Sequence, residues 1–176
     1  VTPSGLDYER LTPDDMTVTD MDMNLVEGKF RPSVALNLWI GFMRARTELN
    51  AVVHTHSPYA TAFSVAYQPI PVITETMANW FGQPVQVTRY LSVEDPEFPT
   101  LPVEVMGNGY AVLLGNHGPI TVGKTLEHAL ERAVTLEEAA RTYSIARTIG
   151  APVTLTEEQA RASFDYYHNR YGQKKS

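Results

Sequence analysis

The sequence predicts an α/β domain in which helices cover both faces of a β-sheet. Short apolar stretches rich in β-branched residues, typical of buried strands, alternate with longer segments whose apolar residues recur every three or four positions, as in helices. The chain has 176 residues, 43% hydrophobic and 19% charged, which is enough for one domain with a substantial core. We therefore expect residues 1–176 to form a single domain.

The N-terminal half is predicted to contain a hairpin, two helices and several short strands. Two short strands around a polar turn, a helix, a strand and a second helix are expected, in that order, at residues 16–28, 34–46, 50–56 and 57–68. The 3–4 spacing in the first helix predicts a buried stripe of Ala35, Leu38, Trp39 and Phe42. Pro58 suits the first turn of the second helix. Further short strands are predicted at residues 70–74 and 84–90.

The C-terminal half is predicted to hold two adjacent buried strands and two helices. The strands are expected at residues 110–116 and 119–123. Thr125 is a suitable cap for a helix reaching about residue 147, which Gly150 and Pro152 would end. The early apolar face of that helix is predicted to be Leu126, Ala129, Leu130, Ala133 and Val134. Thr156 and Gln159 form a capping box, which predicts the start of a last helix. This helix is expected to extend to Gly172.

Composition excludes several classes of protein and of site. The net charge of −6 argues against a nucleic-acid partner, which requires a basic face. No apolar run approaches the length of a membrane span, and the first residues lack the apolar core of a signal peptide, so we expect a cytoplasmic protein without a membrane partner. The sequence contains no cysteine, so a transition-metal site must use histidine, aspartate or glutamate.

The stretch NHGPITVGKT, residues 116–125, matches the phosphate-loop pattern of nucleotide triphosphatases from Gly118 to Thr125. Its middle residues Ile-Thr-Val favour a strand, however, whereas a phosphate cradle needs a tight loop of backbone N–H groups. No apolar strand ending in aspartate follows that could hold magnesium. We therefore interpret residues 123–125 as a turn and helix cap.

Three of the five histidines lie at or just after the ends of predicted strands, in a pattern that suits a metal. His54 and His56 are two positions apart, so on a strand both would face the same side. His117 follows another buried strand and precedes Gly118, which allows close backbone approach. Catalytic zinc sites use three protein ligands and one open position, so these histidines are candidate ligands if the strands are neighbours. His-x-His also occurs in cupins, but the glutamate that should follow is missing and the long C-terminal helices conflict with an all-β fold.

The chain resembles the class II aldolase/adducin family, which includes L-fuculose-phosphate aldolase and L-ribulose-5-phosphate 4-epimerase. The resemblance rests on TPSGLDYERLTPDDM, NAVVHTHSPYATAFS, AVLLGNHGPITVGKTLEHAL and LEEAART, and it covers nearly the whole chain. It implies a three-layer α/β/α sandwich with a mixed, largely antiparallel sheet. It also implies a homotetramer with active sites between subunits, and Zn²⁺, or another divalent metal such as Mn²⁺ or Co²⁺, on His54, His56 and His117.

By the same resemblance, Ser4, Gly5 and Ser33 are phosphate-binding residues, and Tyr171 reaches into a neighbouring subunit's site. The family's upstream glycine-rich loop has no counterpart here, so we expect an N-terminal segment to be missing from the domain. The family's acid/base carboxylate corresponds to Ala35, and the histidine four positions later to Trp39.

Two further departures concern residues 75 and 79. Glu75 occupies the position of a tyrosine in the aldolases, and Asn79 that of the epimerase's catalytic aspartate, which speaks against simple epimerase activity. We hypothesise that Glu75, contributed across a subunit interface, replaces the missing carboxylate as the catalytic acid/base.

The resemblance implies an enzyme that cleaves a ketose 1-phosphate to dihydroxyacetone phosphate and an aldehyde by aldol cleavage. Zinc would act as a Lewis acid that stabilises the enediolate. The alternatives are a decarboxylase or epimerase of the same superfamily acting on a sugar-acid or sugar phosphate, and, last, a non-catalytic adducin-like module. Retention of the three histidines argues against the module, since adducin-like domains lose these ligands.

Overall fold

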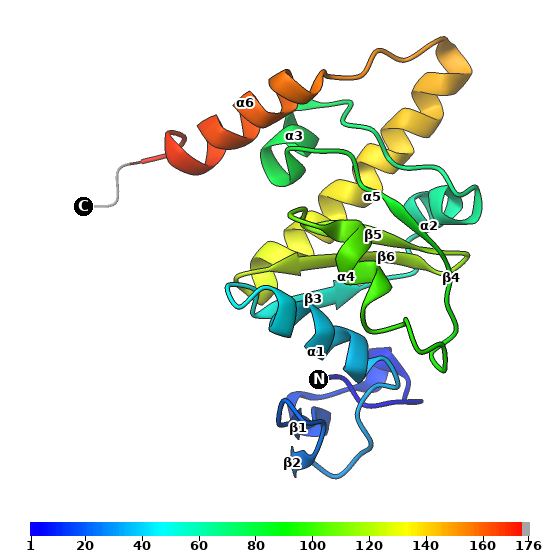
Figure 1. Cartoon of the computed structure of the whole chain (residues 1–176), viewed down its shortest axis with the longest axis vertical. Coiled ribbons are helices and arrows are strands. Elements are labelled where there is room, and N and C mark those ends of the chain that lie inside the picture. The colour runs from blue at the N-terminus through cyan, green and yellow to red at the C-terminus, as the bar shows by residue number, and fades with distance from the viewer. Residues whose placement is uncertain (174–176) are drawn as a thin grey trace.

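A four-stranded mixed sheet forms the centre of the molecule in this computed structural model, which describes residues 1–173 (Figure 1). The spatial order of its strands is β3 (Ala51–His54), β6 (Gly118–Gly123), β5 (Ala111–Gly115) and β4 (Val87–Tyr90). β3 and β5 both pair antiparallel to β6, whereas β4 runs parallel to β5. The expectation of a mixed, largely antiparallel sheet is confirmed.

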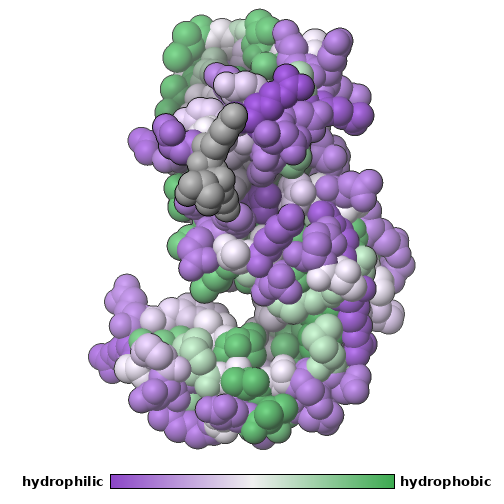
Figure 2. Space-filling model, turned by 90° about the vertical axis from the view of Figure 1, so that its left-hand side faces the viewer, coloured by the Kyte–Doolittle hydropathy of each residue, from purple (hydrophilic) through white to green (hydrophobic). Residues whose placement is uncertain are grey.

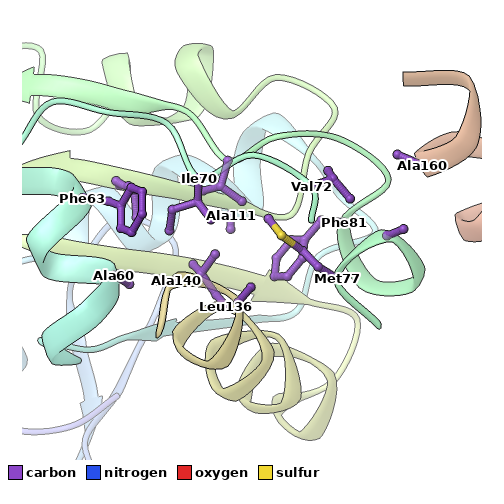
Figure 3. Close-up of a cluster of buried hydrophobic side chains, with 14 residues drawn as sticks. Ala60, Phe63, Ile70, Val72, Met77, Phe81, Ala111, Leu136, Ala140 and Ala160 are labelled. Atoms are coloured by element: carbon purple, nitrogen blue, oxygen red, sulfur yellow. The ribbon is translucent and has the colours of Figure 1, made fainter. Parts of the chain in front are cut away.

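Helices cover both faces of this sheet, which makes the fold a three-layer α/β/α sandwich. One face packs against α1 (Leu36–Ala45) and α4 (Leu101–Met106), through a cluster that includes Leu38, Phe42 and Met106. The other face carries α2 (Pro58–Val65) and the long α5 (Leu126–Ile149). α3 (Glu75–Phe81) and α6 (Glu157–Asn169) pack against each other beyond α5. Figure 3 shows the cluster on this second face, where Phe63, Ile70 and Leu136 converge.

Residues before α1 form a small separate lobe beneath the sheet (Figure 1). It contains two single turns of 3₁₀ helix, Tyr8–Arg10 and Pro13–Asp15. They are followed by the predicted hairpin of β1 (Val18–Thr19) and β2 (Leu25–Glu27). Apolar side chains remain exposed on this lobe, and green residues gather at the same level in Figure 2. The exposed apolar residues of the hairpin region are Val18, Met21, Met23, Leu25 and Val26.

The capping residues predicted from the sequence mark the starts of the last two helices. The Thr125 side chain accepts a hydrogen bond from the His128 backbone N–H at the start of α5. Thr156 and Gln159 form the predicted capping box at the start of α6. The last helix ends at Asn169, three residues before the predicted limit at Gly172.

The predicted strand at residues 70–74 is wrong. Only Ile70 pairs, through an isolated bridge to Val85 in which each N–H donates to the other residue's carbonyl oxygen. The chain then enters α3, whose cap is the Thr74 side chain bonded to the Met77 backbone N–H. The short helix α4 was also not predicted.

The predicted apolar face of α5 is partly wrong. Leu126, Leu130 and Val134 are 61%, 52% and 52% exposed. The buried apolar residues of α5 are mainly small, with one large side chain: Ala129, Ala133, Leu136, Ala139 and Ala140. Small residues let α5 approach the sheet and α2 closely, so the larger apolar residues are left on the opposite side.

Within residues 1–173, no helix combines the length with the apolar composition that crossing a bilayer requires.

The burial pattern of α5 predicts how two leucines on it differ in their contribution to stability. We expect Leu136→Ala to lower the free energy of unfolding by about 2–5 kcal/mol, because Leu136 is fully buried and its loss leaves a cavity. Leu130→Ala, on the exposed side of the same helix, should change it by about 0.5 kcal/mol or less. Denaturant unfolding of both variants measures this, and equal losses would contradict the assigned face.

Candidate metal centre

Three histidines meet at one end of the sheet, where two chain reversals lie side by side. His54 is the last residue of β3 and pairs with Ile120 of β6. His56 follows two residues later, beyond the end of the strand. His117 lies in the two-residue turn that connects β5 to β6. The antiparallel pairing of β3, β6 and β5 therefore brings together residues that are 63 positions apart in sequence.

The imidazoles of these residues direct their Nε2 atoms toward one another. Nε2 of His54 lies 3.1 Å from Nε2 of His56 and 3.2 Å from Nε2 of His117. Nδ1 of His54 lies 3.0 Å from the carbonyl oxygen of Pro119. Because a carbonyl oxygen can only accept, Nδ1 carries the proton and donates it to this bond. The lone pair of His54 Nε2 is thus left free for a ligand.

Burial keeps His54 and His117 in the neutral form that binds metals. Loss of hydration lowers the pKa of His54 to about 4, with further lowering from His117 and His56, against the raising effect of the Pro119 carbonyl. The pKa of His117 is also lowered, again chiefly by burial and then by His56. Both imidazoles are therefore uncharged near neutral pH.

The arrangement fits a tetrahedral divalent metal such as zinc. One ligand atom from each histidine lies within 4.8 Å of the others. Zinc–nitrogen bonds of about 2.0–2.1 Å in a tetrahedron place neighbouring nitrogens about 3.3 Å apart. The observed 3.1 and 3.2 Å separations are close to that value. Three histidines leave one coordination position for water or substrate.

The two turns that carry the ligands approach so closely that only glycine fits between them. A Cβ atom placed on Gly118 would lie 2.5 Å from the carbonyl oxygen of Thr55, between the two His-x-His ligands. The backbone N–H of Thr55 also donates to the Pro119 carbonyl at 3.2 Å. The glycine after His117 thus has a steric reason.

A tyrosine–asparagine contact holds the turn of His117 and was not found from the sequence. Asn116 has a left-handed backbone, with φ of 56°, and Tyr67, with φ of 53°, donates its hydroxyl proton to the Asn116 side-chain oxygen. The Asn116 N–H donates to the carbonyl oxygen of Ser64 at 3.3 Å. Asparagine before His-Gly is the only sequence signal for this turn, since asparagine tolerates positive φ; nothing in the sequence pointed to Tyr67.

The predicted phosphate-binding residues lie together at the start of α1. An isolated bridge joins Pro3 to Pro32, and the backbone N–H of Ser4 donates to the Arg31 carbonyl at 2.9 Å. Gly5 has a left-handed φ of 71° and open space around it. The Ser33 hydroxyl accepts a hydrogen bond from the Ala35 N–H, in front of the first turn of α1. The lobe and the helix start thus place Ser4, Gly5 and Ser33 on neighbouring chain segments.

Helix α1 presents apolar groups where the resembled family has a carboxylate and a histidine. Ala35 is the residue before the first turn of α1. The Trp39 ring lies 5.8 Å from the His54 ring, measured between centroids, and so forms a wall beside the histidines. Among the described residues, no aspartate or glutamate joins the three-histidine group.

Glu75 and Tyr171 lie away from the histidines of their own chain. Glu75 opens α3, and Tyr171 follows α6, where it is 65% exposed and stacks on Tyr167. α3 is tied to the other end of the sheet through Arg132, which donates to the carbonyls of Trp80 and Val122. Figure 1 shows α3 and α6 projecting together from the sandwich. Neither residue can contact its own chain's histidine cluster in this arrangement.

A groove of about 710 Å³ lies elsewhere, between the β1–β2 turn, α1 and α4. Its lining is mainly apolar and includes Met21, Ile40, Gly41 and Val103. None of the histidines and none of the predicted phosphate-binding residues lines it. The histidines and the predicted phosphate-binding residues thus lie outside this groove.

Comparison with known proteins places these features in one family. Residues 1–144 match the family model described as Class II Aldolase and Adducin N-terminal domain. The chain is 34% identical over 186 aligned residues to L-ribulose-5-phosphate 4-epimerase UlaF of Salmonella paratyphi B, an alignment that covers 99% of this chain and 78% of the relative.

Solved structures agree with that match. An L-fuculose 1-phosphate aldolase superposes with a TM-score of 0.90 at 29% identity, covering 95% of this chain and 78% of that one. YgbL from Escherichia coli, described as an aldolase, epimerase or decarboxylase, gives 0.81 at 26% identity, covering 93% and 80%. With the family model spanning most of its residues and the histidine cluster in place, the chain belongs to the class II aldolase/adducin family.

Proposed function

We propose that this protein is a metal-dependent enzyme that cleaves a carbon–carbon bond in a sugar phosphate, most specifically a ketose 1-phosphate, into dihydroxyacetone phosphate and an aldehyde. The observation that carries the proposal is the set of three imidazoles whose Nε2 atoms converge, with the pKa of His54 and of His117 lowered by burial. A divalent metal held there, for which we propose Zn²⁺ ahead of Mn²⁺ or Co²⁺, would supply Lewis-acid stabilisation of negative charge developing on the substrate's carbonyl oxygen.

The sugar-phosphate class is supported by the printed names of the relatives. One is a ribulose-5-phosphate epimerase and another a fuculose 1-phosphate aldolase. We propose that Ser4, Gly5 and Ser33 hold the substrate's phosphate. The hydroxyls of Ser4 and Ser33 can donate hydrogen bonds, and Gly5 leaves space for a phosphate to reach the backbone.

Between the two named activities we favour aldol cleavage over epimerisation. The aspartate that the resemblance assigns to epimerase catalysis is Asn79 here, and its side-chain oxygen accepts a hydrogen bond from the Ser163 hydroxyl at 2.8 Å. An amide cannot act as the acid/base that a carboxylate provides. The curated relatives named as epimerases are the evidence on the other side.

We further propose that the site is completed in a homotetramer by Glu75 and Tyr171 of a neighbouring subunit. Aldol cleavage requires a base to remove a hydroxyl proton from the substrate. Ala35 cannot do so, and the described part of the chain offers no carboxylate in the histidine group. Glu75 opens α3 and Tyr171 follows α6, and these paired helices project from the sandwich, so both residues are available to a neighbour.

The second candidate function is decarboxylation of a 3-oxo sugar acid or its phosphate. The observation that favours it is the Trp39 ring beside the histidines, together with an alanine at position 35 where the resemblance expects a carboxylate. Loss of CO₂ needs an electron sink at the neighbouring carbonyl but no base to start bond cleavage. YgbL, which superposes well, is described with this activity among its alternatives.

The metal site predicts a simple pattern of metal content. We expect the purified protein to bind about one zinc per chain, and His54→Ala or His117→Ala to lose most of it, because two imidazoles are a poor site. His128→Ala, a histidine outside the cluster, should bind as the parent does. Elemental analysis after dialysis against zinc measures this. A parent protein without metal would instead favour the non-catalytic, adducin-like module.

Restoring the carboxylate should separate the two chemistries. We expect Ala35→Glu to raise release of aldehyde from ketose 1-phosphates at least about tenfold, as an added general base does. Val34→Glu, one position away on an exposed residue, is the matched control and should not. A panel of ketose phosphates and 3-oxo acids, scored for aldehyde and for CO₂, identifies the reaction. A metal-bound Ala35→Glu protein with no gain would count against an aldolase site.

The proposed role of Glu75 is tested by removing its charge. If Glu75 is the acid/base, Glu75→Gln should lower turnover of the identified substrate by about a hundredfold or more while zinc binding stays unchanged. Glu94→Gln, at another exposed glutamate, serves as the control. Unaltered turnover in a zinc-loaded Glu75→Gln protein would rule out this role.

A further inference from the structure

Helix α2 touches both of the turns that carry metal ligands. Its N-terminus follows His56 by two residues, with Pro58 in the first turn. Its other end holds the turn of His117. There, the Ser64 carbonyl accepts from the Asn116 N–H, and Tyr67, just after the helix, binds the Asn116 side chain. A shift or tilt of α2 would therefore move His56 and His117 relative to His54, whose strand is fixed by the sheet.

A carboxylate from α5 provides the N-terminal cap of this helix. Glu137 accepts hydrogen bonds from the backbone N–H groups of Tyr59 and Ala60 at 2.9 and 2.8 Å, one on each carboxylate oxygen. The residue in the usual capping position, Ser57, makes no side-chain cap, and Pro58 has no N–H. The two free donors of the first turn are thus both satisfied from another helix, where the helix dipole also favours negative charge.

Packing next to this cap is tight on both sides. Ala60 of α2 and Ala140 of α5 are both fully buried, and Figure 3 shows them on facing sides of the two helices with Leu136 close by. Arg141, one turn beyond Glu137, lies over the Tyr59 ring at 5.8 Å. The two alanines let α2 and α5 approach each other closely. The short distance between the helices allows a carboxylate on α5 to cap α2 directly.

We propose that Glu137 is a positioning residue for the metal site. By capping α2 from α5, it holds the turn of His56 and, through the length of α2, the turn of His117 in the geometry that brings three Nε2 atoms together. It touches neither a histidine nor the substrate, so its role is geometric. The proposal rests on the metal-binding function proposed above.

Glu138 offers a matched control on the same helix. It is exposed and makes no hydrogen bond or ion pair within the described residues. Glu138→Ala therefore makes the same change of charge and of helix propensity as Glu137→Ala without touching the cap. Glu137→Gln keeps one acceptor oxygen but places an N–H₂ group against the other donor, so it should retain part of the function.

The experiment measures zinc affinity by competition with a chelating dye, and the visible spectrum of the Co²⁺-loaded protein, which reports the geometry of the ligands. Thermal unfolding of the metal-free proteins is recorded alongside. We expect Glu137→Ala to weaken zinc binding about tenfold or more, comparable to loss of a supporting group around a metal site, and to alter the Co²⁺ spectrum. Glu137→Gln should fall between it and the parent, and Glu138→Ala should match the parent.

The outcomes separate this proposal from the one on which it rests. A parent protein that binds neither zinc nor Co²⁺ overturns the metal-binding function itself. A parent that binds metal, with Glu137→Ala and Glu137→Gln matching it in affinity and spectrum, overturns the positioning role, even if both variants unfold at lower temperature. If Glu137→Ala does not fold, an altered spectrum and weaker binding in folded Glu137→Gln support the role, and parental values in it reject it.

Discussion

The close approach of two backbone turns is the constraint on which the metal centre depends. At Gly118 the chain passes so near Thr55 that a methyl group would lie 2.5 Å from a carbonyl oxygen. This proximity follows from the sheet, because β3 and β5 both pair antiparallel to β6 and end at the same edge. Strand pairing thus brings the backbones of the three ligands together, and the imidazoles need only point toward one another.

The same closeness concentrates three ring nitrogens at one point. The Nε2 atom of His54 lies 3.1 and 3.2 Å from those of His56 and His117, and the Pro119 bond fixes His54 as an acceptor at Nε2. Burial lowers the pKa of His54 and so disfavours its protonation near neutral pH. The folded core on both faces of the sheet holds this arrangement, and a divalent ion is the ligand that fits it.

Sequence patterns predicted most of this fold because the sheet and its ligands obey local rules. Buried β-branched runs identified the strands of His54 and His117, and caps at Thr125 and Thr156 located the last two helices. The side of α5 that packs inward was predicted poorly, since alanines face the sheet while Leu130 is exposed. Local hydrophobicity does not reveal that a close helix–sheet contact favours small residues.

Contacts between elements far apart in the chain could not be predicted from the sequence, for a different reason. In the sequence, Glu137 is one of several charged residues on a predicted helix, and Tyr67 is a residue near the end of another predicted helix. Their partners are backbone groups or side chains in segments tens of residues away, so no spacing rule exposes them. The left-handed conformation at Asn116 was accessible only as a preference of its residue type.

The position of the candidate proton carriers links catalysis to assembly. Within one chain, α1 brings the Trp39 ring to His54, and an indole ring provides no acid/base group. The exposed Glu75 opens α3, which Arg132 ties to the opposite end of the sheet, and the exposed Tyr171 follows α6, which packs on α3. If Glu75 and Tyr171 act as we propose, a reaction that needs a base requires a second subunit, whereas one that begins with loss of CO₂ does not. The dependence of turnover on protein concentration thus carries information about which bond is broken.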